Sequence, residues 1–333
     1  MNDFNFSLPL ALMQRATIIL VTPALAAANN GNWQTASRWQ RFLRSRYRVL
    51  MQPQWDGQAA DLMLALHARR SADSIARWRA SSTAAPLGVV LTGTDLYRDI
   101  QVDDSAQASL QAAQALIVLN ERGALALPPA QRHKAQVCLQ SASRRKPLQK
   151  SRQRLRALMV GHLRPEKAPE VWMAAARRLR LRGDLRFDHI GEGLDPALAE
   201  LALATMRDQP SYRWLGGLAH GATRERIARA HILVHSSVME GGAHVVIEAV
   251  MSGTPVLASR IDGNVGLLGS DYGGYFDPGD DIALARLIEQ CREDPAMLAA
   301  LQAQCAVRSV LFETAHERTN LHQIVEQLLE KER

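Results

Sequence analysis

The sequence predicts an α/β protein in which two doubly wound parallel-sheet domains face each other across a cleft, with a helical C-terminal tail. Three observations predict this fold. Short apolar runs alternate with longer amphipathic stretches along most of the 333 residues, as βαβ units require. A basic segment at residues 141–154 divides that alternation into two halves. After Asp280 the pattern is helical to Arg333.

The first half is expected to form one domain over residues 1–145. It begins with an apolar run that lacks a basic lead and a cleavage site, so we expect an N-terminal extension and not a signal peptide. A helix is expected at residues 33–46, where Trp39 and Leu43 share an apolar face. The candidate strands are residues 16–21, 48–52, 61–66, 87–93, 115–120 and 135–140.

The basic segment, "SASRRKPLQKSRQR", holds six Lys or Arg residues, one proline and almost no large apolar side chain. This composition predicts a solvated linker between the two domains. The alternative is an arm that binds nucleic acid, but the segment lacks the interleaved aromatic side chains on which bases stack.

The second half is expected to form a domain over residues 146–311, and residues 312–333 to form a helix that packs back toward the first domain. Helices are expected at residues 168–182 and 195–208. Ligands of open parallel sheets bind outside the carboxyl ends of the strands, so we expect a site in the loops that follow strands. The candidate strands are residues 157–161, 185–191, 212–217, 231–237, 255–260 and 274–277.

With 47% hydrophobic and 22% charged residues, the chain has an ordinary globular composition. Its net charge of +7 favours an anionic partner, which could be nucleic acid, an acidic membrane surface or a phosphorylated small molecule. Cys138, Cys291 and Cys305 form no zinc-binding or disulfide pattern, which predicts reduced thiols in the cytoplasm. No run of about 18 consecutive apolar residues occurs, so no membrane span is expected.

The stretch "HILVHSSVMEGGAHVVIEAV", residues 231–250, passes from a strand through a Glu240-Gly241-Gly242 turn into a helix expected from Ala243. Glycines at a helix entrance let the backbone approach a ligand closely, and the free amides there suit a diphosphate. His244 and Glu248 are four residues apart and share a helix face. Glu248 could face the cleft and bind a ribose diol, or it could simply occupy the polar side of an amphipathic helix.

A second candidate loop, in "MVGHLRPEKAPEVW" at residues 159–172, follows the strand that ends near Gly161. His162, Arg164 and Lys167 come within six residues of that glycine, and clustered cations after a strand suit a phosphate-bearing substrate. A charged loop that caps the next helix is the alternative.

In the first half, "AAANNGNW" follows the first strand. Asn30, Gly31 and Asn32 can present amides to an anionic acceptor, with Arg38 one turn further. A plain loop with a helix cap at Asn32 is equally consistent with the pattern.

The loop "TGTDLYRD" follows the fourth strand and is expected to place Thr92, Thr94, Asp95 and Arg98 on the cleft. Asp95 could instead be a helix N-cap. His67 and His189 lack a paired partner in the sequence pattern and are expected to be structural. No carboxylate cluster or "DxD" element has the spacing of a metal site, which predicts a metal-independent protein without a cofactor.

The interval from Glu240 to Glu248 resembles the E-x7-E pattern of the retaining nucleotide-sugar glycosyltransferases with the GT-B fold of two Rossmann-like domains. The resemblance implies that Glu240 meets the donor sugar and that Glu248 binds the nucleotide ribose. It also implies that Lys167 binds the diphosphate. Backbone amides would come from the intervening residues, Gly241, Gly242, Ala243 and His244.

This chain departs from that family pattern at three points. The family's arginine after the strand-end glycine is His162 here, so either His162 or Arg164 would bind phosphate. The family's "EGFG" is "EGGA". Members often have a histidine near Thr94 that contacts the donor sugar, and Thr94 with Asp95 would replace it here.

Four stretches together resemble the selenosugar synthases of selenoneine biosynthesis, a branch of these transferases: "NNGNWQTASRWQRFL", "LTGTDLYRDI", "SVMEGGAHVVIEA" and "IDGNVGLLGSDYGGYFDPGD". The resemblance implies transfer from UDP-N-acetylglucosamine or UDP-glucose to selenophosphate, with a carbon–selenium bond formed at the anomeric carbon. Two alternatives remain open. One is a conventional GT-B transferase with a hydroxyl acceptor. The other is a basic nucleic-acid-binding protein without catalysis, although the chain carries no known recognition motif.

Overall fold

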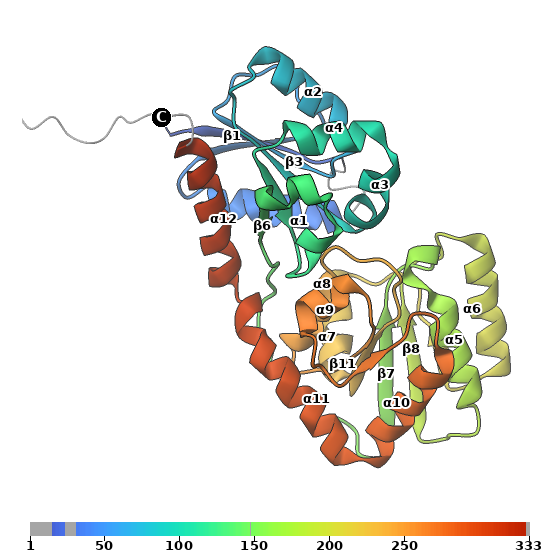
Figure 1. Cartoon of the computed structure of the whole chain (residues 1–333). Helices are drawn as coiled ribbons and strands as arrows, with labels where there is room; N and C mark the ends of the chain where they lie inside the picture. The colour runs from blue at the N-terminus through green and yellow to red at the C-terminus, as the bar shows by residue number, and fades with distance from the viewer. Residues whose placement is uncertain (1–14, 24–30, 147, 331–333) are drawn as a thin grey trace, which may run out of the picture.

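The computed structural model describes residues 15–23, 31–146 and 148–330, and it consists of two parallel six-stranded sheets with helices on both faces of each (Figure 1). The sheets belong to two domains, the first above the second in Figure 1, and the chain passes from one to the other twice. The predicted α/β fold class is confirmed.

The first sheet has the strand order β2-β1-β3-β4-β5-β6, and every neighbouring pair is parallel. Its central strands are apolar and fully buried, because helices cover both faces. The strands are β1 (Thr17–Val21), β2 (Arg48–Gln52), β3 (Leu62–Leu66), β4 (Leu87–Leu91), β5 (Ala115–Val118) and β6 (Ala135–Val137).

Helices α2 and α4 cover one face of this sheet, where Trp55 and Trp78 pack edge to face at a centroid distance of 5.1 Å. Helix α1 covers the other face through Trp39 and Leu43. The helices are α1 (Gly31–Leu43), α2 (Ala72–Ser81), α3 (Ile100–Val102) and α4 (Asp104–Ala112), with a π-helix at Asp95–Asp99 and 3-10 turns at Gly123–Ala126 and Pro129–Lys134.

The second sheet has the order β12-β11-β10-β7-β8-β9 and is also wholly parallel. Its core includes Trp172 against Phe187, with ring centroids 5.2 Å apart. The strands are β7 (Leu155–Val160), β8 (Leu185–Ile190), β9 (Tyr212–Trp214), β10 (Ile232–His235), β11 (Val256–Ser259) and β12 (Tyr275–Phe276).

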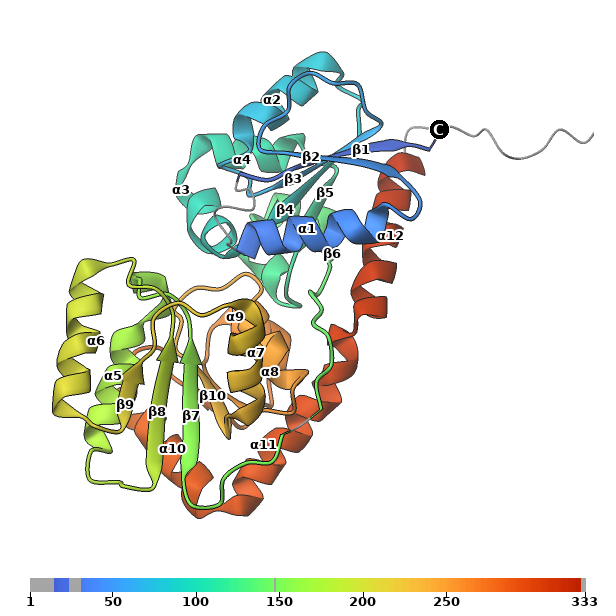
Figure 2. The same ribbon diagram turned by 180° about the vertical axis from the view of Figure 1, so that it is seen from behind.

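Helices α5, α6 and α10 pack beside one another on one face of the second sheet, and α7, α8 and α9 lie on the other (Figures 1 and 2). A 3-10 turn at Pro165–Lys167 precedes α5. The helices are α5 (Pro169–Arg178), α6 (Pro196–Asp208), α7 (His220–Arg229), α8 (His244–Val250), α9 (Asp262–Leu268) and α10 (Asp281–Glu293).

The C-terminal helices run along the side of the molecule and connect the two domains (Figure 2). Helix α11 (Pro295–Arg308) packs on the second domain, and after a 3-10 turn (Ser309–Phe312), helix α12 (Thr314–Glu330) packs on the first. Apolar residues of α12, including Leu321 and Val325, share a core with Ile18 and Trp39. The last described helix, α12, therefore packs on the same sheet that contains the first described strand, β1.

One stretch of the described residues, Pro295–Phe312, is long and apolar enough by length and composition to cross a membrane, with a mean hydropathy of 1.2. This stretch is not a run of consecutive apolar residues, because polar residues interrupt it. Its inner side packs on the second domain through Leu301, Cys305 and Phe312, which is the pattern of an amphipathic surface helix.

The segment between β6 and β7 has no regular secondary structure, but it is not simply solvated. Ser141 and Ala142 are buried, and the Arg145 amide donates to the Met251 carbonyl at 2.9 Å. The expectation of a solvated linker is wrong for Ser141 and Ala142, because they run between α8 and the C-terminal helices. It is confirmed for residues 143–146 and 148–154, which are exposed or half-buried.

Candidate functional site

The loops at the carboxyl ends of the two sheets meet directly. A Cβ placed on Gly241 would lie 2.6 Å from the Gly93 nitrogen, and one on Gly263 would lie 1.9 Å from the Glu240 carbonyl oxygen. Glycine is required at both positions because a larger residue would collide with backbone. Thr92 and Gly93 after β4 therefore form a wall against which the Glu240–Gly241 turn rests.

Asn120 stabilises this contact, and it was not among the residues predicted from the sequence. Its Nδ2 donates to the Gly241 carbonyl at 2.7 Å and to the Tyr97 hydroxyl at 3.1 Å. Burial raises the pKa of Tyr97 to about 12, so the hydroxyl keeps its proton. Its position in the sequence could have indicated it, because Asn120 is a polar residue two places after β5, at the same sheet edge as Thr92.

Lys167 and Glu240 form an ion pair at the centre of these loops. His235, the last residue of β10, lies with its Nε2 3.3 Å from Glu240 Oε1. Burial alone would raise the pKa of Glu240, but the Lys167 ammonium and His235 outweigh it and hold that pKa well below its usual range. Glu240 is therefore a carboxylate at neutral pH and cannot donate a proton. His235 was not among the predicted residues.

The loop that presents Lys167 is held in an uncommon backbone conformation. Ala168 is left-handed, with a φ of 43°, and is buried. Ser236 Oγ lies 3.0 Å from both the Lys167 and the Ala168 carbonyl oxygens, which holds the turn against β10. A left-handed alanine costs free energy, and such outliers gather at functional sites.

The two other cations of this loop differ in exposure. His162 is half-buried, its Nδ1 accepts from the Glu192 amide at 3.1 Å, and burial lowers its pKa below 6.5. A neutral imidazole whose Nδ1 accepts a backbone proton carries its own proton on Nε2, so it could offer a phosphate a hydrogen bond but no positive charge. Arg164 is exposed beside it, which makes Arg164 the better placed cation of the two.

Glu248 lies deeper than expected, with 4% of its surface exposed. His220 Nε2 is 2.6 Å from its Oε1, His244 Nδ1 is 3.5 Å from the same oxygen, and Arg224 Nη1 is 3.6 Å away. Burial would raise the pKa of Glu248, but hydrogen bonds from the two histidines hold it at about 2. Glu248 shares a helix face with His244 as expected, but its carboxylate is buried in contact with His220, His244 and Arg224.

Helix α8 begins at His244 and has seven residues, one residue later than expected. Ala243 is buried, so its side chain packs in the core while Gly242 stays half-buried beside Leu119 and Gln140. A helix this short has a weak dipole, and any anion here would depend mainly on Lys167 and Arg164 for charge.

On the acceptor side, the structure corrects the assignment of Arg38. Its Nε donates to Glu317 Oε2 at 2.8 Å, and the residue is 8% exposed, so its charge is neutralised inside the protein. Gly31 and Asn32 form the first turn of α1, so Asn32 is not the helix cap. Asn30 lies outside the described residues. Arg38 therefore anchors α12 and cannot bind an acceptor.

Asp95 was expected to lie on the cleft or to cap a helix, and both expectations are wrong. It is fully buried, and its carboxylate accepts from the Ala68 amide at 2.8 Å, so it neither caps a helix nor faces the cleft. Thr92 and Thr94 are half-buried beside the wall at Gly93. Arg98 does reach the other domain, with Nη1 3.5 Å from Glu166 Oε1. The reason for the error is that Asp95 opens a π-helix, which turns its side chain inward.

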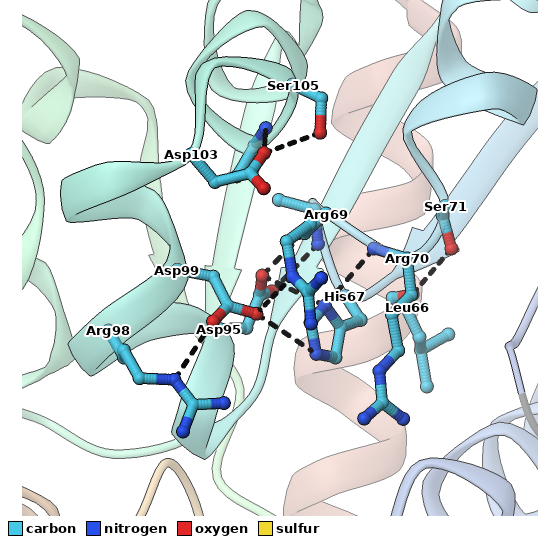
Figure 3. A network of polar contacts seen from close by, with 12 residues as sticks. Leu66, His67, Arg69, Arg70, Ser71, Asp95, Arg98, Asp99, Asp103 and Ser105 are labelled. Carbon is cyan, nitrogen blue, oxygen red and sulfur yellow. Dashed lines mark hydrogen bonds and ion pairs between the residues drawn. The ribbon is translucent and has the colours of Figure 1, made fainter.

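The two histidines that appeared unpaired have partners. His189 contacts the Tyr212 hydroxyl at 3.0 Å and the Gly161 carbonyl at 3.1 Å, and burial lowers its pKa to about 4. It is a structural histidine, as expected. His67 lies 3.1 Å from Asp95 in the network of Figure 3. The absence of a partner in sequence says nothing about partners brought together by the sheet.

Among the described residues, His67, Asp95 and Asp99 have the mutual spacing of a metal site. The Arg69 Nε already donates to Asp99 Oδ2 at 2.8 Å (Figure 3). That guanidinium balances the charge a cation would balance, so the arrangement is better described as an ion-pair network.

A cavity of about 330 Å³ lies between α7 and strands β7 and β8, away from the carboxyl ends of the strands. Asp188 in its wall is paired with Arg213 at 2.7 Å, and Arg229 is paired with Glu225 at 2.7 Å. Because its charges are satisfied internally and it lacks the loops described above, we do not assign the active site to it.

A family model described as Glycosyl transferases group 1 matches residues 140–306, half of the chain and most of the second domain. The curated D-inositol 3-phosphate glycosyltransferase of Streptomyces avermitilis is 28% identical over 171 residues. That alignment covers 46% of this chain and 36% of the relative, so the match spans little more than a third of that protein.

Solved structures share the fold over nearly the whole chain. Sucrose-phosphate synthase from Thermosynechococcus elongatus has a TM-score of 0.75 at 17% identity and covers 95% of this chain and 100% of its own. HepE from Anabaena, in complex with UDP and glucose, has a TM-score of 0.73 at 17% identity over 94% and 99%. At these identities the likeness shows the fold, which is GT-B.

Proposed function

Because the chain belongs to the group 1 glycosyl transferases, we propose that it transfers a sugar from a UDP-sugar to selenophosphate and forms a carbon–selenium bond. The observation that carries this proposal is the Lys167–Glu240 ion pair, set at the carboxyl ends of β7 and β10 and against the wall at Thr92 and Gly93. It puts a cation for a diphosphate and a carboxylate for sugar hydroxyls in one place.

The donor would be UDP-N-acetylglucosamine or UDP-glucose. HepE, a structural neighbour, has been solved in complex with UDP-glucose. Lys167 and Arg164 would bind the diphosphate, and the Glu240 oxygen away from Lys167 would accept from a sugar hydroxyl. The ion pairs of Glu248 with described residues all use Oε1, so Oε2 would accept from the ribose.

In the proposed reaction, selenium attacks the anomeric carbon and forms the C–Se bond, while the bond from that carbon to the UDP oxygen breaks. UDP leaves with the bonding electrons, and Lys167 with Arg164 stabilises the charge that develops on it. Water then cleaves the Se–P bond, on or off the enzyme, to release phosphate. These two cations would take the role that a metal takes elsewhere, so we propose a metal-independent reaction without a cofactor.

The acceptor would lie between the domains, near Thr92, Thr94, Gly31 and Asn32. The close approach of Gly93 to Gly241 supports a compact acceptor over a polymer, because little space separates the two loops there. Exclusion of water by this contact would protect the donor from hydrolysis. We also propose a cytoplasmic protein with reduced thiols, since all three cysteines are free and buried. We propose no nucleic-acid partner, because the chain carries no known recognition motif.

The proposal is tested by incubating the protein with each UDP-sugar and selenophosphate, thiophosphate or phosphate side by side, with mass spectrometry of the products. A selenium-containing sugar and equimolar UDP support it. Absence of both with every donor would overturn it.

A conventional transferase with a phosphorylated hydroxyl acceptor is the second candidate, because the curated relative is a D-inositol 3-phosphate glycosyltransferase. UDP release with an inositol phosphate but not with selenophosphate would favour it. The same assay therefore separates the two acceptors while testing one donor site.

A further inference from the structure

His67 occupies a strained and buried position directly after β3. Its φ is 74°, a left-handed conformation that is uncommon outside glycine although histidine, like asparagine and aspartate, adopts it more often than most residues, and it is 2% exposed. Nδ1 lies 3.1 Å from Asp95 Oδ1 and Nε2 lies 3.8 Å from Asp99 Oδ2 (Figure 3). Nε2 is buried and has no hydrogen-bond partner among the described residues. The imidazole is therefore held at Nδ1, by the Asp95 carboxylate and by the Arg70 amide, which donates to Nδ1 at 3.4 Å.

Asp95 joins the loop after β3 to the loop after β4. One carboxylate oxygen accepts from the Ala68 amide at 2.8 Å, and the other faces His67 Nδ1. Asp95 is also the first residue of the π-helix, and the Leu96 amide donates back to the Thr92 carbonyl at 2.8 Å. Fixing Asp95 thus fixes the turn from Thr92 to Leu96, which carries the wall at Gly93.

Two arginines and a further acid surround the other end of the network. Asp99 accepts from Arg69 Nε at 2.8 Å and from Arg98 Nε at 3.1 Å. Asp103, the next acidic residue along the chain, caps helix α4. Arg98 continues to Glu166, the neighbour of Lys167. The turn before the π-helix therefore meets the second domain at Gly241, through Gly93, and the π-helix itself meets it at Glu166, through Arg98.

We propose that His67 is a positioning residue for glycosyl transfer, which acts through Asp95 to hold Thr92 and Gly93 against the Glu240–Gly241 turn. This inference rests on the proposed function, in which that contact closes the site around the donor sugar. His67 itself is buried and touches no substrate. Apart from the close approach of His67 Nδ1, the contact that this Asp95 oxygen makes with the described residues is the Arg69 amide, at 3.5 Å.

Three substitutions test which contact matters. His67→Asn keeps a donor near the Nδ1 position and tolerates the left-handed backbone. His67→Gln places a donor toward Asp99 instead, and His67→Ala removes both. We expect His67→Ala and His67→Gln to lower kcat about tenfold, the effect of a lost polar contact with a charged group, and His67→Asn to stay within about threefold of wild type.

The KM for the UDP-sugar should change little in all three, because the donor loops belong to the second domain. Ser71→Ala is the matched control: Ser71 is buried in the same loop and donates to the Leu66 carbonyl at 2.7 Å, so its loss should lower Tm but leave kcat unchanged. Equal loss of kcat in His67→Asn and His67→Ala, or an unchanged kcat in His67→Ala, would overturn the inference.

If wild type releases no UDP with any acceptor, the proposed function has failed and hydrogen exchange still tests the positioning claim. The reporter is the Leu96 amide, which is bonded to Thr92. Its exchange should be faster in His67→Ala than in His67→Asn, with Ser71→Ala as reference for general destabilisation. Equal exchange rates in the two His67 variants would show that His67 does not hold the turn.

Discussion

The Lys167 ammonium and the Glu240 carboxylate form an ion pair that joins two loops of the second sheet, one after β7 and one after β10. Neither side chain is in the hydrophobic core, and each is mostly shielded from water, with 17% and 12% of the side chain exposed. Shielding strengthens the interaction of either group with a ligand charge. A diphosphate would attract Lys167 away from Glu240, which would free the carboxylate for a sugar hydroxyl.

Lys167→Ala should lower kcat and kcat/KM together, by about a hundredfold, because its charge acts mainly as UDP departs. Steady-state UDP release measures both constants. Lys134→Ala serves as control, since that lysine binds the Leu110 and Gln111 carbonyls far from the donor loops. A rise in KM with unchanged kcat would restrict Lys167 to ground-state binding.

Glu248→Gln should raise the KM for the UDP-sugar about tenfold or more, if a charged hydrogen bond to the ribose worth about 1.5–3 kcal/mol is weakened. Glu225→Gln on the exposed side of α7 is the matched change, because among the described residues the ion pair of Glu225 is with Arg229, one turn away. Donor kinetics equal to wild type in both variants would remove Glu248 from the site.

The His220–Glu248 pair should make stability depend on pH. The hydrogen bond to Glu248 raises the pKa of His220 above 6.5, so its contribution is complete below that value and is lost as pH rises through the raised pKa. Glu248 has a pKa of about 2, so its contribution to stability is complete above pH 4.5 and is lost as the pH falls through that lowered pKa. Both groups therefore make their full contribution to stability in the window between pH 4.5 and pH 6.5.

His220→Ala should therefore lower Tm most in that window and least once the pH has risen through the raised pKa of His220. The effect should be modest and weakened by salt, because the His220 side chain is 63% exposed. Thermal unfolding of wild type and variant at a series of pH values measures it. A Tm difference that grows steadily toward alkaline pH would contradict the pairing.

Gly241→Ala should lower kcat at least tenfold with little change in UDP affinity, because the added methyl would collide with Gly93 and hold the domains apart. Gly221→Ala, in α7, meets no atom within 4 Å and should behave as wild type. Small-angle scattering would report the separation of the domains, and an unchanged kcat in Gly241→Ala would argue against closure at this contact.

Glu317→Ala should destabilise the protein by about 3–5 kcal/mol, since it leaves the Arg38 charge buried and unpaired. Glu317 accepts hydrogen bonds from Arg38 Nε, Trp39 Nε1 and Ser141 N. The donor–acceptor distance is 2.8 Å in each of the three. Denaturant unfolding measures the loss. Glu326→Ala, whose partner Arg46 is exposed, should change stability by less than about 1 kcal/mol.

The fold followed from sequence because strand and helix patterns are local, and both sheets lie close to the predicted ranges. The Gly241–Gly242 turn and the loop of Lys167 could likewise be placed at strand ends. Arg38 and Asp95 could not be assigned correctly, because their partners are Glu317, 279 residues away, and Ala68, 27 residues away. Such pairings follow from tertiary packing and leave no spacing signal in one chain.

His220, His235 and Asn120 were missed for a related reason. Each is an ordinary polar residue near a strand end, and only the arrangement of the sheets brings it to Glu248, Glu240 or Gly241. The metal-site spacing of His67 with Asp95 also depends on neighbouring strands, β3 and β4.

Calorimetric titration of UDP tests the central claim most directly, because it needs no acceptor. We predict saturable one-to-one binding to wild type, at least tenfold weaker binding to Lys167→Ala and to Glu248→Gln, and wild-type affinity in Lys134→Ala and Glu225→Gln. Absence of UDP binding to wild type, or equal affinity in all five proteins, would contradict the assignment of these loops as the donor site.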